Sequence, residues 1–382
     1  MPAAGSKVGQ IGGLAAHALA QGRLGEVPSA MRAAVYLGNQ KVRVESIPTP
    51  EIGDGEVLIQ VESCGICHTD LKKIEYDLLA PPRVFGHETA GVIAAVGAGV
   101  TEYEPGDRVV VFHHIPCMNC FYCRHKLYAQ CPVYKRVGVT AGFEPAGGGF
   151  GQYVRAMDWI VRRGIEKIPE GVAFERASFV EPVNTCVKGF AMLGAGHGDV
   201  VVVLGQGPIG LIFTMLARRA GATVLATDAM GHRRGMAERF GALAAYDPRD
   251  ARFREHVGDL TEGRGADFAI VAASARGIVE QAVEGTRPGA KILLFAQTSH
   301  QERIEVSGAD VCVGERALLG SYSASVDLQK ESAELVFSGA LPVEGLISDI
   351  VALDEIGDGI ELALHPLERS LKIMVQPQRW QD

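Results

Sequence analysis

The stretch that decides the fold is VVVVLGQGPIG, residues 200–210. Its five consecutive apolar residues predict a strand that is buried on both faces, and the pattern G-x-G-x-x-G follows that strand directly. Pro208 suits the first turn of a helix, where the N–H that proline lacks would have no partner. We therefore predict a strand, a tight turn and a helix, the unit that holds the pyrophosphate of a dinucleotide at its helix N-terminus.

The three glycines of this pattern have different expected roles. Gly205 permits the tight turn, Gly207 lets a pyrophosphate approach the backbone, and Gly210 lets the helix pack closely on the strand. The cofactor-binding residues predicted in this segment are Gly205, Gly207, Pro208, Ile209 and Gly210.

Asp228 ends the next expected strand, close to the usual offset for the carboxylate that accepts from the adenosine ribose. A carboxylate there repels a 2′-phosphate, so the sequence favours NAD over NADP. Arg233 and Arg234 follow within a few residues and could hold a phosphate, which keeps NADP as the less favoured alternative. Asp228 and Arg233 are therefore added to the predicted cofactor-binding residues.

Strands and helices alternate on the C-terminal side of this turn. We expect helices over residues 208–220 and 232–240, and strands over 222–227, 267–272 and 291–295. This alternation predicts a doubly wound parallel sheet. Before it the chain is mostly strand and turn, with strands expected over 56–62, 91–96 and 107–112, and a last strand follows over 371–375. The predicted fold class is α/β, a β-rich domain plus a parallel-sheet domain.

Length and composition agree with two domains. The chain has 382 residues, 47% of them hydrophobic, and a net charge of −8 without a long basic stripe, which argues against a nucleic-acid partner. No apolar run is long enough to cross a bilayer, and residues 1–30 lack the features of a secretory signal, so we expect a cytoplasmic protein that acts on a small molecule. We interpret residues 1–30 as an N-terminal extension.

Four of the eight cysteines fall in one short segment, as Cys117-x2-Cys120-x2-Cys123-x7-Cys131. Four thiolates form the closed, tetrahedral ligand set of structural zinc. An iron–sulfur cluster is the rival interpretation, because ferredoxin runs share the two short gaps and a following proline, but their third gap is three residues instead of seven. We predict a structural-zinc lobe over residues 113–132.

Three further segments carry a resemblance to a known family: Gly65-Ile-Cys-His-Thr-Asp70, Gly86-His-Glu88 and Glu181-Pro-Val. With the cysteine lobe and the glycine pattern in this order, the chain after Met31 resembles the medium-chain zinc-dependent alcohol and polyol dehydrogenases, in the branch of sorbitol and threonine dehydrogenases. The resemblance implies a GroES-like catalytic domain over residues 31–182, a Rossmann NAD-binding domain over 183–320 and a return to the catalytic domain over 321–382.

The resemblance also implies roles for individual residues. Cys67 and His87 would bind a catalytic zinc, Thr69 would pass the alcohol proton, and Asp70 would orient His87. Two carboxylates, Glu88 and Glu181, compete for the place of the third protein ligand.

Other positions carry weaker implications. His68 and Lys372 fall where the family has residues that contact the cofactor, and Lys72 stands where simple alcohol dehydrogenases have the histidine that ends the proton relay. Cys64, Cys186 and Cys312 are expected to be core residues without a chemical role.

The resemblance implies two zinc ions per chain, a homodimer or homotetramer, and hydride transfer between a secondary alcohol and NAD. The alcohol would be of the polyol, cyclitol or amino-alcohol type. An NADPH-linked aldehyde or ketone reductase of the same family is the alternative. A non-catalytic protein that binds zinc and a nucleotide is a third and less favoured interpretation.

Overall fold

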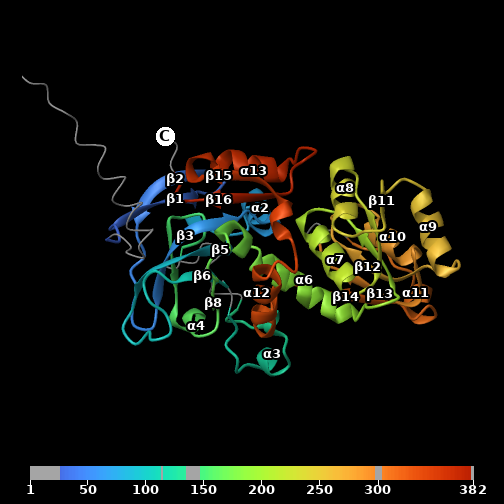
Figure 1. The fold of residues 1–382 in the computed structure, drawn as a ribbon, viewed down its shortest axis with the longest axis horizontal. Coiled ribbons are helices and arrows are strands. Elements are labelled where there is room, and N and C mark those ends of the chain that lie inside the picture. Colours follow the sequence, from blue (N-terminus) through green and yellow to red (C-terminus); the bar gives the residue numbers. More distant parts are fainter. Residues whose placement is uncertain (1–25, 113–114, 135–146, 297–302, 380–382) are drawn as a thin grey trace, which may run out of the picture. The chain divides into compact units, whose positions relative to one another are not determined.

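The computed structural model describes residues 26–112, 115–134, 147–296 and 303–379, and the chain divides into two compact units (Figure 1). Among the described residues, those of 26–178, 350–360 and 374–379 form the first unit, and those of 179–349 and 361–373 form the second. The expected N-terminal extension, most of which precedes residue 26, and His113 and His114 at the start of the expected zinc lobe lie outside the described residues.

The second unit extends further along the chain than expected. The resemblance implies a return to the catalytic domain over 321–382, but residues 321–349 belong to the second unit. The reason is packing, because helix α12 (Gln329–Phe337) lies against helix α6 (Val180–Leu193). The side-chain amide of Asn184 also donates to the Ser325 carbonyl oxygen at 3.1 Å and accepts from the Ser325 N–H at 2.8 Å.

The first unit is built on antiparallel pairs. A three-stranded sheet has the order β2-β1-β4, and a larger sheet has the order β15-β16-β3-β5-β6-β8, with β7 paired to β3. Buried side chains of β3, among them Val57, Ile59 and Val61, form part of its core. The strands are β1 (Ala30–Tyr36), β2 (Val42–Pro48), β3 (Val57–Gly65), β4 (Arg83–Val84), β5 (Glu88–Val96), β6 (Arg108–Val111), β7 (Tyr153–Ala156), β8 (Ile165–Lys167), β15 (Ile347–Ala352) and β16 (Lys372–Gln376). The division between the units crosses two of them, because residues 347–349 of β15 and 372–373 of β16 are counted with the second unit.

Short helices connect these strands. They are α2 (His68–Glu75), α3 (Phe121–Arg124), η2 (Tyr128–Gln130), α4 (Asp158–Val161), α5 (Phe174–Ala177), η5 (Leu353–Glu355) and α13 (Ile356–Leu364), of which residues 361–364 are counted with the second unit. The strands expected over 56–62, 91–96, 107–112 and 371–375 are confirmed as β3, β5, β6 and β16.

The second unit contains a six-stranded parallel sheet of order β11-β10-β9-β12-β13-β14. Numbered from β9, this is the order 3-2-1-4-5-6 of the doubly wound dinucleotide-binding fold, so the predicted fold class is confirmed. The strands are β9 (Val200–Leu204), β10 (Thr223–Thr227), β11 (Ala244–Tyr246), β12 (Ala266–Val271), β13 (Thr286–Leu294) and β14 (Ala317–Gly320).

The helices of this unit alternate with its strands. They are α7 (Pro208–Arg219), α8 (Gly231–Arg239), α9 (Arg252–Thr261), α10 (Ile278–Glu284), α11 (Gly308–Cys312) and, after β14, η3 (Val326–Leu328), α12 and η4 (Val343–Leu346). The predicted helices 208–220 and 232–240 are confirmed as α7 and α8 within one residue at each end. Within the described ranges no helix combines the length and the apolar character needed to cross a membrane.

One expectation about the core is wrong. The sequence predicts that Cys312 is a core residue, but it is exposed, because no residue of the five-residue helix α11 that contains it is buried. Cys64 and Cys186 are buried as expected.

Candidate active site

The first unit brings together Cys67, His87 and Glu88. One potential ligand atom from each of these side chains lies within 4.8 Å of the others. Cys67 immediately precedes helix α2 and has an extended backbone, while Glu88 begins strand β5 with His87 directly before it. A thiolate, an imidazole nitrogen and a carboxylate oxygen are all ligands that zinc accepts, and three protein ligands leave a fourth position for substrate. The donor set therefore fits a catalytic zinc ion.

A close backbone packing holds the segment that carries His87. Gly86 has a φ of +100°, and a Cβ there would come within 2.7 Å of the Phe150 ring. The Gly149 N–H donates to the Gly86 carbonyl at 2.9 Å and the Phe150 N–H to the Phe85 carbonyl at 2.9 Å. Sequence reasoning did not find this support, because nothing in the stretch around Phe150 indicates which loop it contacts.

Asp70 fixes the orientation of the His87 ring. Its Oδ1 lies 3.0 Å from His87 Nδ1, and both side chains are buried. Burial by itself lowers the pKa of His87, but the negative charges and hydrogen bonds of Asp70 and Cys67 outweigh it and raise that pKa well above its usual value. The pocket therefore favours a positive charge, as a cation site should.

The exposed side of helix α2 carries the other predicted residues. Thr69 and Lys72 are spaced i, i+3 along α2, and His68 and Lys72 are spaced i, i+4, so both pairs are neighbours on the helix surface. Desolvation and the positive charge of Lys72 lower the pKa of His68. Burial likewise lowers the pKa of Lys72. A larger fraction of Lys72 than of an ordinary surface lysine is therefore unprotonated near neutral pH and able to accept a proton.

Glu181 belongs to the second unit. It lies in the first turn of α6 and is 8% exposed. Cys186 is one turn further along the same helix and is fully buried, in agreement with its interpretation as a packing residue.

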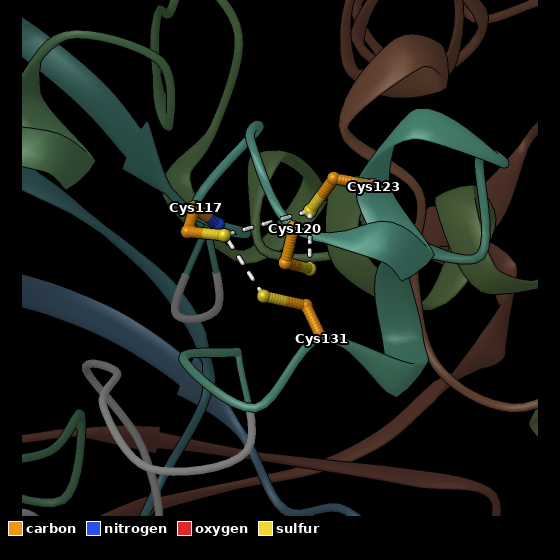
Figure 2. A group of neighbouring side chains, drawn as sticks. All are labelled: Cys117, Cys120, Cys123 and Cys131. Carbon is orange, nitrogen blue, oxygen red and sulfur yellow. Dashed lines mark hydrogen bonds between the residues drawn. The ribbon is translucent and has the colours of Figure 1, made fainter.

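The four clustered cysteines converge in the first unit (Figure 2). Cys117 Sγ lies 3.9 Å and Cys120 Sγ lies 3.5 Å from Cys123 Sγ, and the Cys117 N–H donates to Cys131 Sγ at 3.4 Å. Tetrahedral zinc with Zn–S bonds of about 2.3 Å places its sulfur atoms about 3.8 Å apart. The sulfur spacing therefore fits a structural zinc ion.

The backbone turns and the thiol pKa values of this lobe also fit a metal site. Met118 and Lys126 have φ values of 62° and 57°, so the chain turns sharply after Cys117 and again after α3. Burial opposes ionisation of Cys131, yet N–H donors, that of Cys117 first, lower its pKa to about 7. Burial and the neighbouring thiols raise the pKa of Cys123 to about 12. The four thiols thus share protons unequally, and a dication that replaces those protons would stabilise all four thiolates.

In the second unit the glycine turn has the geometry that the sequence predicts. Gly205 has a φ of +95°, and a Cβ at Gly210 would lie 1.8 Å from the Gly205 carbonyl oxygen. A Cβ at Gly207, by contrast, would meet only Nη1 of Arg233, at 3.8 Å. Pro208 is the first residue of α7, and Ile209 is the second. The space beside Gly207 suits the approach of a pyrophosphate to the helix N-terminus.

Asp228 lies directly after β10, beside this turn, and is 8% exposed. Its Oδ2 accepts from the Gln206 N–H at 2.7 Å and its Oδ1 from the Met230 N–H at 2.8 Å. The carboxylate is therefore held rigidly at the end of β10. Each oxygen has a second lone pair, which lets the group also accept from a ribose hydroxyl.

Arg233 and Arg234 are both held by backbone carbonyls in this structure. Arg233 Nη2 donates to the Ser370 carbonyl at 3.0 Å, and Arg234 Nη1 donates to the Asp228 and Ala229 carbonyls at 2.8 and 2.9 Å. Lys372, the first residue of β16, is buried.

Gln206 is a second residue that sequence reasoning did not find. Its buried side chain accepts from Thr214 Oγ1 at 2.9 Å and donates to the Val203 carbonyl at 3.2 Å, which ties the turn to both the strand and the helix. The pattern treats this position as variable, so it gives no signal of that contact.

Comparisons with known proteins give dehydrogenases. Residues 53–170 match the family model described as alcohol dehydrogenase GroES-like domain, and residues 208–338 match the model described as zinc-binding dehydrogenase. Sorbitol dehydrogenase of Bacillus subtilis is 30% identical over 359 residues, which cover 92% of this chain and 99% of the relative.

Two crystal structures extend the comparison. A Sinorhizobium meliloti protein described as a zinc-binding dehydrogenase, with NADP bound, is 29% identical with a TM-score of 0.83 and covers 92% of this chain and 100% of its own. The 2R,3R-butanediol dehydrogenase of Bacillus subtilis is 26% identical with a TM-score of 0.79 and covers 91% of this chain and 100% of its own.

Proposed function

Because this chain belongs to the medium-chain zinc-dependent alcohol and polyol dehydrogenases, we propose that it transfers hydride between the secondary carbinol carbon of a polyol or vicinal diol and NAD. The observation that carries this proposal is the convergence of ligand atoms from Cys67, His87 and Glu88 within 4.8 Å. The likeness to sorbitol and butanediol dehydrogenases supports an alcohol with a neighbouring hydroxyl group as the substrate.

The residues of the first unit would prepare the alcohol for this reaction. A zinc ion, when bound, acidifies an alcohol hydroxyl and polarises a ketone. Cys67, His87 and Glu88 would hold the ion, and Asp70 would keep the His87 ring in place. Cys117, Cys120, Cys123 and Cys131 would hold a second, structural ion.

We choose Glu88 over Glu181 as the third ligand. Glu88 is buried and lies next to His87 in the same unit as Cys67. Glu88 is the first residue of β5, and it pairs with Gly65, the last residue of the antiparallel strand β3. This strand pairing fixes its position. Glu181 lies in the second unit, in the first turn of α6, and remains the alternative ligand.

The released proton would leave along α2. Thr69 Oγ1 would take it from the substrate hydroxyl, and Lys72 Nζ, whose pKa is lowered, would take it onward. Lys72 would thus serve where simple alcohol dehydrogenases use a histidine.

NAD is the proposed cofactor. The rigid Asp228 carboxylate would accept from a ribose hydroxyl and repel a 2′-phosphate. The NADP in the Sinorhizobium meliloti structure favours the alternative, a reductase linked to NADPH, and Arg233 and Arg234 would be its phosphate ligands. Here both arginines are held by backbone carbonyls, which supports NAD. Gly205, Gly207, Pro208, Ile209, Gly210, His68 and Lys372 would complete the cofactor site.

We further propose that the chain is a homodimer or homotetramer in the cytoplasm. None of the eight cysteines, all in the described part of the chain, forms a disulfide, as suits a reducing compartment. Light scattering of the zinc-loaded protein measures the oligomeric state.

A substrate screen tests the function. Sorbitol, xylitol, 2,3-butanediol, threonine, inositol and 2-propanol are each supplied with NAD or NADP, and formation of the reduced cofactor is followed by absorbance. We expect a polyol or diol with NAD to give the highest kcat/KM. Turnover of 2-propanol alone, or a strong preference for NADP, would contradict the proposal.

A further inference from the structure

Beside helix α8 the second unit contains a cavity of 450 Å³ that the proposed reaction does not use. Its walls come from one face of α8, from residues 345–349 and from residues 362–371, all of which belong to this unit. Among the described residues that line it, none belongs to the glycine turn, and Asp228 is not part of the lining. The cavity is therefore distinct from the predicted dinucleotide turn.

Basic side chains dominate the polar part of this cavity. His232 and Arg239 lie on one face of α8, and Arg369, from the loop after α13, lines the same cavity. Within the described part of the chain, neither arginine side chain has an ion pair or hydrogen bond. Asp349 also lines the cavity, and Glu368 accepts from the His232 N–H at 2.8 Å. The lining thus contains two guanidinium groups and one carboxylate, so its positive charges outnumber its negative ones.

The hydroxyl groups of the cavity already have partners. Ser348 Oγ accepts from the Leu371 N–H at 2.9 Å and donates to the Lys372 carbonyl at 3.4 Å. Ser370 Oγ accepts from the Leu367 N–H at 3.1 Å. The guanidinium groups are therefore the main polar groups that the cavity offers to a ligand.

The rest of the lining is apolar. Met236, Ile347, Leu362, Leu367 and Leu371 contribute it. Leu367 is 69% exposed, although it is a large aliphatic side chain. An apolar ligand group against these side chains would remove that surface from water, which is favourable in proportion to the area covered.

We propose that this cavity binds a small organic anion with a carboxylate or phosphate head and a short apolar body. The head lies between Arg239 and Arg369, whose planar guanidinium groups match either oxyanion in a bidentate manner. The body lies against Met236, Leu362 and Leu371.

The site lies beside the dinucleotide turn without being part of it. Successive residues of a helix diverge by about 100°, so His232 and Arg233 point in different directions. His232 lines the cavity, whereas Arg233 reaches to 3.8 Å from the Cβ position of Gly207. A bound dinucleotide should therefore leave the cavity open to the anion.

Isothermal titration of the zinc-loaded full chain tests the proposal. Octanoate and octyl phosphate are titrated separately, with and without saturating NADH, and their relative affinities identify the preferred head group. Octanol supplies the apolar body alone, and acetate and inorganic phosphate supply the heads alone. We expect one saturable site per chain for at least one of the two amphiphilic anions, with affinity about tenfold or more above octanol and the bare heads.

Matched variants decide where the anion binds. Arg239→Gln combined with Arg369→Gln should weaken it by about tenfold or more, since both charged partners are lost. Arg249→Gln combined with Arg252→Gln, at exposed arginines paired with Asp247 and Asp250, should leave the affinity unchanged. Thermal melting checks that both variants are folded, and dehydrogenase activity should be unchanged in each.

Four results would overturn the proposal: neither anion saturates, octanol binds as tightly, NADH displaces the anion, or the Arg239/Arg369 variant binds as tightly as the wild type. The last would place the anion elsewhere, for example at the catalytic metal. Loss of dehydrogenase activity in every protein would contradict the proposed function alone, because the anion site does not depend on it.

Discussion

His87 Nδ1 lies 3.0 Å from Asp70 Oδ1 in a pocket where both side chains are buried. Because Nδ1 contacts the carboxylate, the other ring nitrogen, Nε2, points away from Asp70. A carboxylate that holds one nitrogen of a ligand histidine raises the basicity of the other, and such partners are part of the design of a metal site.

The first prediction concerns this pair. Asp70→Asn keeps the size of the side chain but removes its charge, so the catalytic zinc should bind about 10–100-fold more weakly. Competition with a chelator, followed by zinc analysis, measures the loss. Glu75→Gln, at an exposed position on the same helix, is the control and should leave zinc retention unchanged. Equal zinc retention in the Asp70 variant would show that Asp70 does not support the metal.

The second prediction separates two glycines of the turn. Gly210→Ala would place a Cβ 1.8 Å from the Gly205 carbonyl oxygen, so the backbone must move, at a cost of about 1–3 kcal/mol in the free energy of unfolding.

A Cβ at Gly207 meets no such obstacle, and the φ of −67° at this position suits alanine. The free energy of unfolding of Gly207→Ala should therefore change by less than about 1 kcal/mol. The added methyl group instead occupies the space that the pyrophosphate needs, and the Kd of NADH should rise. Denaturation and cofactor titration measure the two effects. A Gly207 variant with normal NADH affinity would refute the assigned role.

The third prediction concerns cofactor choice. Asp228→Asn removes one negative charge, so the ratio of kcat/KM with NADP to that with NAD should rise about tenfold, equivalent to about 1.4 kcal/mol of repulsion. Asp250→Asn, at a half-buried carboxylate of the same unit that pairs with Arg252, is the control. A ratio that is unchanged in the Asp228 variant would remove the argument for NAD.

The fourth prediction follows from the cysteine environments. Burial raises the pKa of Cys64 to about 12, so at pH 8 on the order of 0.01% of it is thiolate, the reactive form. The thiolate fraction would grow about tenfold per pH unit below that pKa. Cys312 is exposed, and iodoacetamide should modify it first in the native zinc-loaded protein.

Peptide mass analysis identifies the labelled cysteine. Cys312→Ser should abolish the fast reaction, and a chelator should then expose Cys117, Cys120, Cys123 and Cys131. Rapid modification of Cys64 in the folded protein would contradict its burial.

The parallel-sheet domain is the part of the fold that local sequence predicts best. Strand β9 is a run of five buried apolar residues, and the glycine turn and the start of α7 at Pro208 follow from short-range sterics. The four-cysteine lobe is predictable for the same reason, since its ligands are close in sequence.

Features that depend on contacts distant in sequence were not predictable. The segment around Phe150 supports the His87 loop through backbone hydrogen bonds that any residue type can make. Residues 321–349 join the second unit because α12 packs on α6, and no local pattern specifies that partner. Our preference for Glu88 over Glu181 is of the same kind, because both are acidic residues beside a family motif and it rests on the proximity of Glu88 to Cys67 and His87.

The most direct test of the central claim is the zinc content of active protein, measured together with its activity. Wild-type protein and Glu181→Gln should contain two zinc ions per chain, whereas Cys67→Ser and Glu88→Gln should keep only the cysteine-lobe zinc and lose turnover while remaining folded. Full activity in wild-type protein that holds a single zinc, or unchanged zinc and activity in the Cys67 variant, would contradict the account.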